Sequence, residues 1–238
     1  MIIIPDIHGR DFWEKPVQDY LGREHIVFLG DYLDPYDYEG VPLFEVFPRF
    51  EEILRLKHQY PDTITLLLGN HDLQYVDERI GHSRFDGFHA TRNRDMILGN
   101  THSFQIALDM TISGRRYLFS HAGVRYGWLL SHKDILGDLP IKDPAKRLND
   151  LWWDEQSRPA LLSALADIPY SRWGGSLYGS PVWSDVEDLD DTAFEIPDTF
   201  QIFGHTQQEF EPVIGQHYAC LDVRKAFRLT EEGAIKAI

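Results

Sequence analysis

Short apolar runs recur along the chain, and each run is followed by polar or charged residues. The five clearest runs are Ile2–Ile4, Ile26–Leu29, Thr63–Leu68, Tyr117–Phe119 and Phe200–Phe203. They are brief and in part β-branched or aromatic, which is typical of strands that are buried on both faces. The pattern therefore predicts five buried strands spread over most of the sequence.

Apolar positions spaced three and four residues apart predict helices between these strands. The clearest stripe consists of Phe47, Phe50, Ile53 and Leu54. Two more helices are predicted, one capped at Asp143-Pro144 and one over 158–166. The segment 215–229 instead predicts a β-hairpin or meander, so a mixed sheet is expected. Strands that alternate with helices indicate an α/β architecture. Because no linker divides the sequence, we expect a single domain over 1–238.

The amino-acid composition limits the kinds of molecule that this protein is expected to bind. Of 238 residues, 43% are hydrophobic, and 23 basic against 38 acidic residues give a net charge of −15. This charge argues against binding to duplex nucleic acid or anionic membranes and is compatible with bound cations. The single cysteine, Cys220, excludes an intramolecular disulfide and a cysteine-based zinc site. Without a long apolar segment or a signal peptide, a soluble cytoplasmic protein is expected.

Residues that can bind metals or transfer protons follow all five predicted strands. The segments are Asp6-Ile7-His8-Gly9, Gly30-Asp31-Tyr32-Leu33-Asp34, Gly69-Asn70-His71-Asp72, Ser120-His121-Ala122-Gly123 and Gly204-His205-Thr206-Gln207. Taken singly, each is more typical of an ordinary turn or a packed core histidine. Five such segments, each directly after a predicted strand, are unexpected if they are unrelated turns. Because sites in α/β sheets form at the carboxyl ends of strands, we expect these loops to converge.

This order of motifs resembles the calcineurin-like metallophosphoesterases. It is most similar to the phosphoprotein-phosphatase branch, which includes bacterial protein phosphatases and diadenosine tetraphosphatases. The segment Val182-Trp183-Ser184-Asp185 matches that branch as well. The motifs run from residue 6 to residue 206 and are specific for the superfamily rather than for a substrate. The resemblance implies a layered αββα sandwich, with two mixed sheets flanked by helices.

The resemblance also implies a dinuclear metal site. Its ligands would be Asp6, His8, Asp31, Asn70, His121 and His205, with Asp31 bridging both ions. Mixed imidazole and oxygen ligands suit manganese, iron, zinc and similar ions and do not choose among them. Manganese is the first expectation, with iron, zinc, nickel or cobalt as alternatives. In such a site, a metal-bound hydroxide attacks phosphorus in line.

Two further residues have catalytic roles implied by the resemblance. His71 would be the general acid that protonates the leaving alkoxide, and Asp34 would pair with it and favour its charged form. The competing interpretations are that Asp34 is a solvated turn residue before Pro35 and that His71 is a packed core histidine.

The chain departs from the branch at one motif. The branch usually continues Asp-Arg-Gly, whereas this chain reads Asp34-Pro35-Tyr36, so the arginine that clamps the substrate phosphate is absent there. Arg10, beside the first motif, is the first candidate to bind the phosphate instead. The other candidates are Arg79, Arg84, Arg92, Arg94 and Arg125.

The sequence therefore predicts a metal-dependent phosphoesterase. Its substrate would be a phosphomonoester on a small molecule or on a serine or threonine of a phosphoprotein. The alternative is a dinucleoside polyphosphate or another nucleotide, and the sequence does not choose between the two. A non-catalytic binding scaffold is the remote alternative, because His71 and all the implied ligands are present.

Overall fold

The computed structural model describes residues 1–137, 143–186 and 196–238. The chain forms two compact units. The first contains residues 1–104 and 224–238, and the second contains residues 105–223. The single-domain organisation expected from the sequence stays a prediction.

The first unit contains a six-stranded sheet with the order β11-β10-β1-β2-β3-β4. Its strands are β1 Ile2–Ile4, β2 Ile26–Phe28, β3 Ile64–Leu67, β4 Phe104–Gln105, β10 Phe227–Leu229 and β11 Ile235–Ala237. Strands β1, β2 and β3 run parallel, whereas β10 pairs antiparallel with both β1 and β11. Every residue of β1, β2 and β3 is buried, so the first three predicted strands are confirmed as buried strands.

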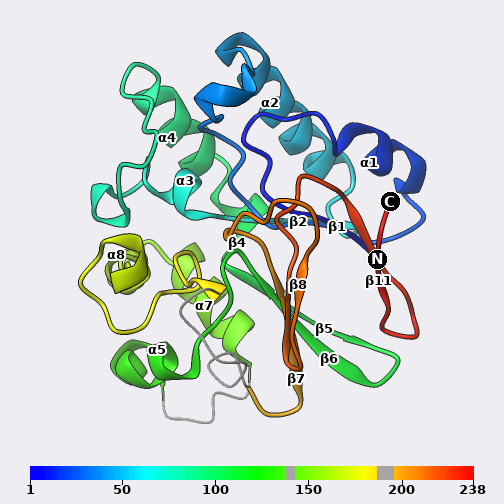
Figure 1. The fold of residues 1–238 in the computed structure, drawn as a ribbon. Helices are drawn as coiled ribbons and strands as arrows, with labels where there is room; N and C mark the ends of the chain where they lie inside the picture. Colours follow the sequence, from blue (N-terminus) through cyan, green and yellow to red (C-terminus); the bar gives the residue numbers. More distant parts are fainter. Residues whose placement is uncertain (138–142, 187–195) are drawn as a thin grey trace. The chain divides into compact units, whose positions relative to one another are not determined.

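Helices connect the parallel strands of the first unit (Figure 1). They are α1 Glu14–Tyr20, α2 Leu43–Gln59, α3 Asn70–Leu73 and α4 Ala90–Leu98, with 3-10 turns at Asp37–Glu39, Glu78–Ile80 and Thr101–Ser103. Helix α1 links β1 to β2, and α2 links β2 to β3. The predicted stripe Phe47, Phe50, Ile53 and Leu54 is buried on α2. Because parallel strands need such crossovers, these helices bring the strands' carboxyl ends to one edge of the sheet.

The second unit contains a five-stranded sheet with the order β5-β6-β7-β9-β8. Its strands are β5 Ala107–Ile112, β6 Arg115–Ser120, β7 Thr199–Phe203, β8 Val213–Ile214 and β9 Tyr218–Cys220. Strand β7 runs parallel to β6 and β9, and the outer strands β5 and β8 are antiparallel to their neighbours. Both sheets are therefore mixed, and the predicted α/β class is confirmed.

The helices of the second unit are short. They are α5 Tyr126–Ser131, α6 Lys133–Leu136, α7 Pro144–Trp153 and α8 Arg158–Leu165, with a 3-10 turn at Tyr170–Arg172. The predicted cap is confirmed, because the Asp143 carboxylate accepts a 2.9 Å hydrogen bond from the Lys146 amide. Among the helices that the structure describes, none combines the length and apolarity needed to span a membrane.

The hairpin expected over 215–229 is wrong. Strand β9 pairs parallel with β7 in the second unit, whereas β10 pairs antiparallel with β1 in the first. From residue 213 onward, the antiparallel pairs formed by consecutive strands are β8 with β9 and β10 with β11. Two apolar runs separated by six residues are compatible with a hairpin or with a change of sheet, and long-range pairing decides between them.

Candidate functional site

The loops that follow β1 and β2 are joined by backbone hydrogen bonds. The amides of Ile7 and His8 both donate to the Asp31 carbonyl oxygen, at 3.1 and 2.7 Å. His8, Asp31 and Asp34 have φ values of 45°, 54° and 58°, a left-handed region that is uncommon for residues other than glycine. Such a backbone costs free energy and persists where the surroundings enforce it, which is typical of functional sites.

The His8 ring is oriented as a metal ligand would be. Its Nδ1 lies 2.9 Å from the Leu33 carbonyl oxygen, which can only accept, so we assign the proton to Nδ1. Its Nε2 is then an acceptor and lies 3.5 Å from Asp31 Oδ2. Burial, reinforced by neighbouring cationic groups, lowers the pKa of His8 well below its usual value, although Asp31 opposes this shift. A neutral imidazole facing a buried carboxylate fits a divalent cation.

The predicted ligands of the first unit gather at one edge of its sheet. His8 and Asp31 are buried beside His71, which is predicted as the acid rather than as a ligand, and candidate ligand atoms of the three all lie within 4.8 Å of one another. Asp6 and Asn70 are each 1% exposed and follow β1 and β3, the two neighbours of β2. The segments that carry these carboxylate, imidazole and amide side chains thus follow adjacent strands, where the sequence predicts a metal site.

His71 and Asp34 form a buried pair. His71 Nδ1 lies 3.0 Å from Asp34 Oδ2, and the two side chains are 5% and 1% exposed. The Asp34 carboxylate also accepts hydrogen bonds from Gln74 Nε2, at 2.5 Å, and from the Tyr75 hydroxyl. Burial raises the pKa of Asp34, and the hydrogen bonds from His71 and Tyr75 act in the opposite direction. Asp34 is therefore not a solvated turn residue.

Asp72 has a structural role that sequence reasoning missed. Its fully buried carboxylate accepts the backbone amides of Asp31 at 2.8 Å, Tyr32 at 3.0 Å and Gly69 at 2.9 Å. These bonds tie the loop after β2 to the loop after β3. An acidic residue three positions after Gly69, in the first turn of α3, is the local signal of such a carboxylate cap.

Replacing Asp72 by Ala is expected to lower the free energy of unfolding by about 3 kcal/mol or more, because a buried amide without an acceptor costs about 1–3 kcal/mol. Urea unfolding measures the change. Asp62→Ala is the control, since Asp62 is an exposed aspartate after α2. Equal unfolding midpoints for the two variants would contradict the role assigned to Asp72.

The two remaining predicted histidines lie together in the second unit. His121 and His205 follow the parallel neighbours β6 and β7, and His121 Nε2 lies 3.1 Å from His205 Nδ1. His205 has a left-handed φ of 67°. The ring of Trp183, from the predicted Trp-Ser-Asp segment, meets His205 edge-on at 5.5 Å. Two buried imidazoles with facing nitrogens are a further set of donors that suits a divalent cation.

Comparison with known proteins identifies the family. The sequence profile of the calcineurin-like phosphoesterases matches residues 1–209. The chain belongs to this family. The match confirms the superfamily predicted from the motifs.

The chain is also similar to two individual proteins. The symmetrical bis(5'-nucleosyl)-tetraphosphatase of Paracidovorax citrulli is 27% identical over 193 residues, which are 77% of this chain and 62% of that protein. The chain thus spans less than two thirds of that relative. A solved structure of a protein serine/threonine phosphatase from Saccharomyces cerevisiae has a TM-score of 0.51 at 14% identity, covering 100% of this chain and 78% of that one. At 14% identity, the similarity shows a shared fold and nothing about the substrate.

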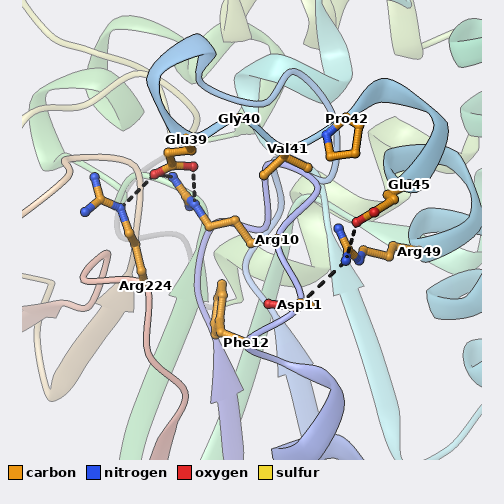
Figure 2. Close-up of a pocket in the computed structure, with 10 residues that line it drawn as sticks. All are labelled: Arg10, Asp11, Phe12, Glu39, Gly40, Val41, Pro42, Glu45, Arg49 and Arg224. Atoms are coloured by element: carbon orange, nitrogen blue, oxygen red, sulfur yellow. Dashed lines mark hydrogen bonds and ion pairs between the residues drawn. The ribbon is translucent and has the colours of Figure 1, made fainter.

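Arg10 donates hydrogen bonds to neighbouring acceptors (Figure 2). Its guanidinium donates to both carboxylate oxygens of Glu39, at 2.7 and 3.0 Å, and to the Asp6 carbonyl oxygen at 3.2 Å. Arg224 also contacts Glu39, at 3.0 Å. Arg10, Glu39 and Arg224 line a pocket of about 390 Å³. Phosphate binding by Arg10 stays a prediction, and this geometry gives it a structural role between the first motif loop and the Asp37–Glu39 turn.

The other candidate arginines differ in their partners. Arg79 pairs with Asp77, and Arg92 pairs with Glu51. Arg84, by contrast, has its Nη2 3.0 Å from His71 Nε2. Sequence reasoning included Arg84 among the candidates without a reason to prefer it.

Proposed function

We propose that this phosphoesterase is a metal-dependent hydrolase of phosphomonoesters, with phosphoserine and phosphothreonine residues of proteins among its candidate substrates. The observation that carries the proposal is the buried His71–Asp34 pair beside His8 and Asp31. Cleavage of an alkyl phosphate needs a proton for the leaving oxygen as well as stabilisation of negative charge. A histidine held by a carboxylate, next to a set of cation ligands, is suited to both needs.

We propose further that Asp6, His8, Asp31, Asn70, His121 and His205 would hold two divalent ions, with Asp31 as the ligand shared by both. Support comes from each unit separately: the acceptor Nε2 of His8 faces Asp31 in the first, and two imidazoles face each other in the second. We propose manganese as the ion, with iron, zinc, nickel or cobalt as alternatives, since the donor types suit all of these. When bound, the ions would supply Lewis acidity and an activated water.

The residues around His71 determine where its proton is held. Since Nδ1 faces Asp34, Nε2 is the atom available to protonate a leaving oxygen. Asp34 orients the ring, and Gln74 and Tyr75 orient Asp34 in turn. Asp34 is therefore a positioning residue in the proposed mechanism, and His71 is its general acid.

Hydrolysis of a dinucleoside polyphosphate is the second candidate function, favoured by the similarity to a bis(5'-nucleosyl)-tetraphosphatase. The test is a panel of phosphopeptides, phosphorylated metabolites and diadenosine tetraphosphate, each with several divalent ions. We expect the highest kcat/KM for a monoester. A higher value for diadenosine tetraphosphate would favour the second candidate, and no turnover with any ion would overturn both. Cytoplasmic location and the lack of binding to duplex nucleic acid or membranes stay predictions.

Removing metal is expected to lower the melting temperature. Buried carboxylates such as Asp6 and Asp31 repel one another unless cations neutralise them. A ligand that binds only the folded state stabilises it by about 2.7 kcal/mol at 100 times its Kd. Thermal unfolding in chelator and then in excess manganese measures the effect, and Asp31→Asn is expected to show a smaller shift. Identical melting with chelator and with every divalent ion tested would contradict the proposed centre.

A further inference from the structure

We propose that Arg84 binds the phosphoryl oxygens of the substrate in place of the arginine missing after Asp34. This proposal rests on the proposed function. Arg84 is half-buried, and its Nη2 lies 3.0 Å from His71 Nε2 and 3.3 Å from His8 Nε2. Its Nε donates to the Asp34 carbonyl oxygen at 3.2 Å. The guanidinium thus lies close to both the proposed acid, His71, and a proposed metal ligand, His8.

The segment that lacks the arginine contributes an aromatic surface for Arg84. Arg84 Cζ lies 3.7 Å from the centroid of the Tyr36 ring, and Tyr36 contacts the His8 ring edge-on at 5.0 Å. Stacking on an aromatic face restrains the plane of a guanidinium and leaves the N–H groups at its edge free to donate. Tyr36 therefore orients the edge of Arg84 towards His71 and His8.

Hydrogen bonds join the loop that carries Arg84 to the residues that hold the His71–Asp34 pair in place. Gln74 Nε2 donates to the Ser83 carbonyl oxygen at 3.0 Å, and the Asp86 amide donates to the Tyr75 hydroxyl at 2.9 Å. Gln74 and Tyr75 are the same side chains that donate to the Asp34 carboxylate.

Further contacts restrain this loop. Phe85 stacks on Tyr75 with ring centroids 4.8 Å apart, and Arg84 has a left-handed φ of 49°. Together with the Gln74 and Tyr75 hydrogen bonds, these contacts mean that one network positions both the proposed acid and the proposed phosphate-binding arginine. Such shared support holds two functional groups at a fixed separation.

The partners of Arg84 leave a place for an anion. Within residues 1–137, 143–186 and 196–238, Arg84 forms no ion pair with a carboxylate, whereas Arg10 pairs with Glu39. Arg84 Nη2 lies 3.0 Å from His71 Nε2, the atom proposed to protonate the leaving oxygen. The guanidinium can therefore donate to an acceptor that also approaches His71 Nε2. Phosphoryl oxygens are such acceptors and bind guanidinium groups strongly.

The test compares Arg84→Gln and Arg84→Lys with Arg55→Gln, a control in which the replaced arginine is exposed on α2 and pairs with Glu52. Each metal-loaded protein is titrated with inorganic phosphate by calorimetry, and KM and kcat are measured with p-nitrophenyl phosphate. We expect Arg84→Gln to weaken phosphate binding about 10- to 100-fold and to raise KM, with wild-type metal content. Arg84→Lys should lie between, because lysine lacks the planar fork, and Arg55→Gln should match wild type.

Tyr36 provides a second test that leaves the arginine in place. Tyr36→Leu is expected to weaken phosphate binding less than Arg84→Gln does, and Tyr36→Phe should restore it because the aromatic face is retained. Wild-type phosphate affinity and KM in Arg84→Gln would overturn the inference and leave the proposed function intact. Phosphate affinity lowered in Arg84→Gln, without turnover of any ester by wild type, would support the binding role and overturn the proposed function.

Discussion

Replacing Asp31 by Asn is expected to reduce kcat by about 10³-fold or more. Metal ions contribute several kcal/mol to the stabilisation of charge in the transition state, and each 1.4 kcal/mol corresponds to a tenfold change in rate. An amide has one oxygen donor and no charge, so it cannot bridge two cations as a carboxylate does. Turnover and metal content are measured together, and both are expected to fall.

Asp31→Asn tests the metal centre rather than the fold, because the amide oxygen can still accept the hydrogen bond that Asp31 Oδ1 receives from the His71 backbone at 2.9 Å. Circular dichroism should match wild type. Asp37→Asn is the matched control, since Asp37 is an exposed aspartate a few residues further along the chain. Near-normal turnover in Asp31→Asn would remove the two-metal mechanism.

The second large effect concerns His71 and depends on the leaving group. If His71 is the general acid, His71→Asn should reduce the rate about 10²–10⁴-fold with an alkyl phosphate. The loss should be much smaller with nitrophenyl phosphate, because its leaving group needs little protonation. Rates for both substrates are measured in wild type and in the variant, with metal content as a check.

Two further variants sharpen this comparison. Asp34→Asn should show a weaker form of the same leaving-group dependence, because Asp34 acts on His71 through a 3.0 Å contact with Nδ1. His58→Asn is the control, since this exposed histidine lies on α2. An unchanged ratio of the two rates in His71→Asn, with intact metal content, would mean that another group delivers the proton.

The sequence by itself determined the elements that carry the site. The runs that became β1, β2, β3, β6 and β7 are short, apolar and followed by turns, so their type follows from local composition. Since parallel neighbours end at the same edge of a sheet, the sequence also indicated that Asp6, Asp31 and Asn70 would lie close together. The Asp34–His71 contact was expected only through the family resemblance.

Only the tertiary structure decided which distant groups meet. It assigned β9 and β10 to different sheets, because strand pairing depends on backbone partners that a local pattern does not specify. In the folded chain, Arg10 donates a hydrogen bond to Glu39, and Arg84 donates one to the backbone of Asp34, 50 residues away in the sequence. An arginine in a polar loop looks the same in sequence whether it faces solvent or a site. The path of the loop sets its position, and that path is fixed here by long-range contacts of Gln74 and Tyr75.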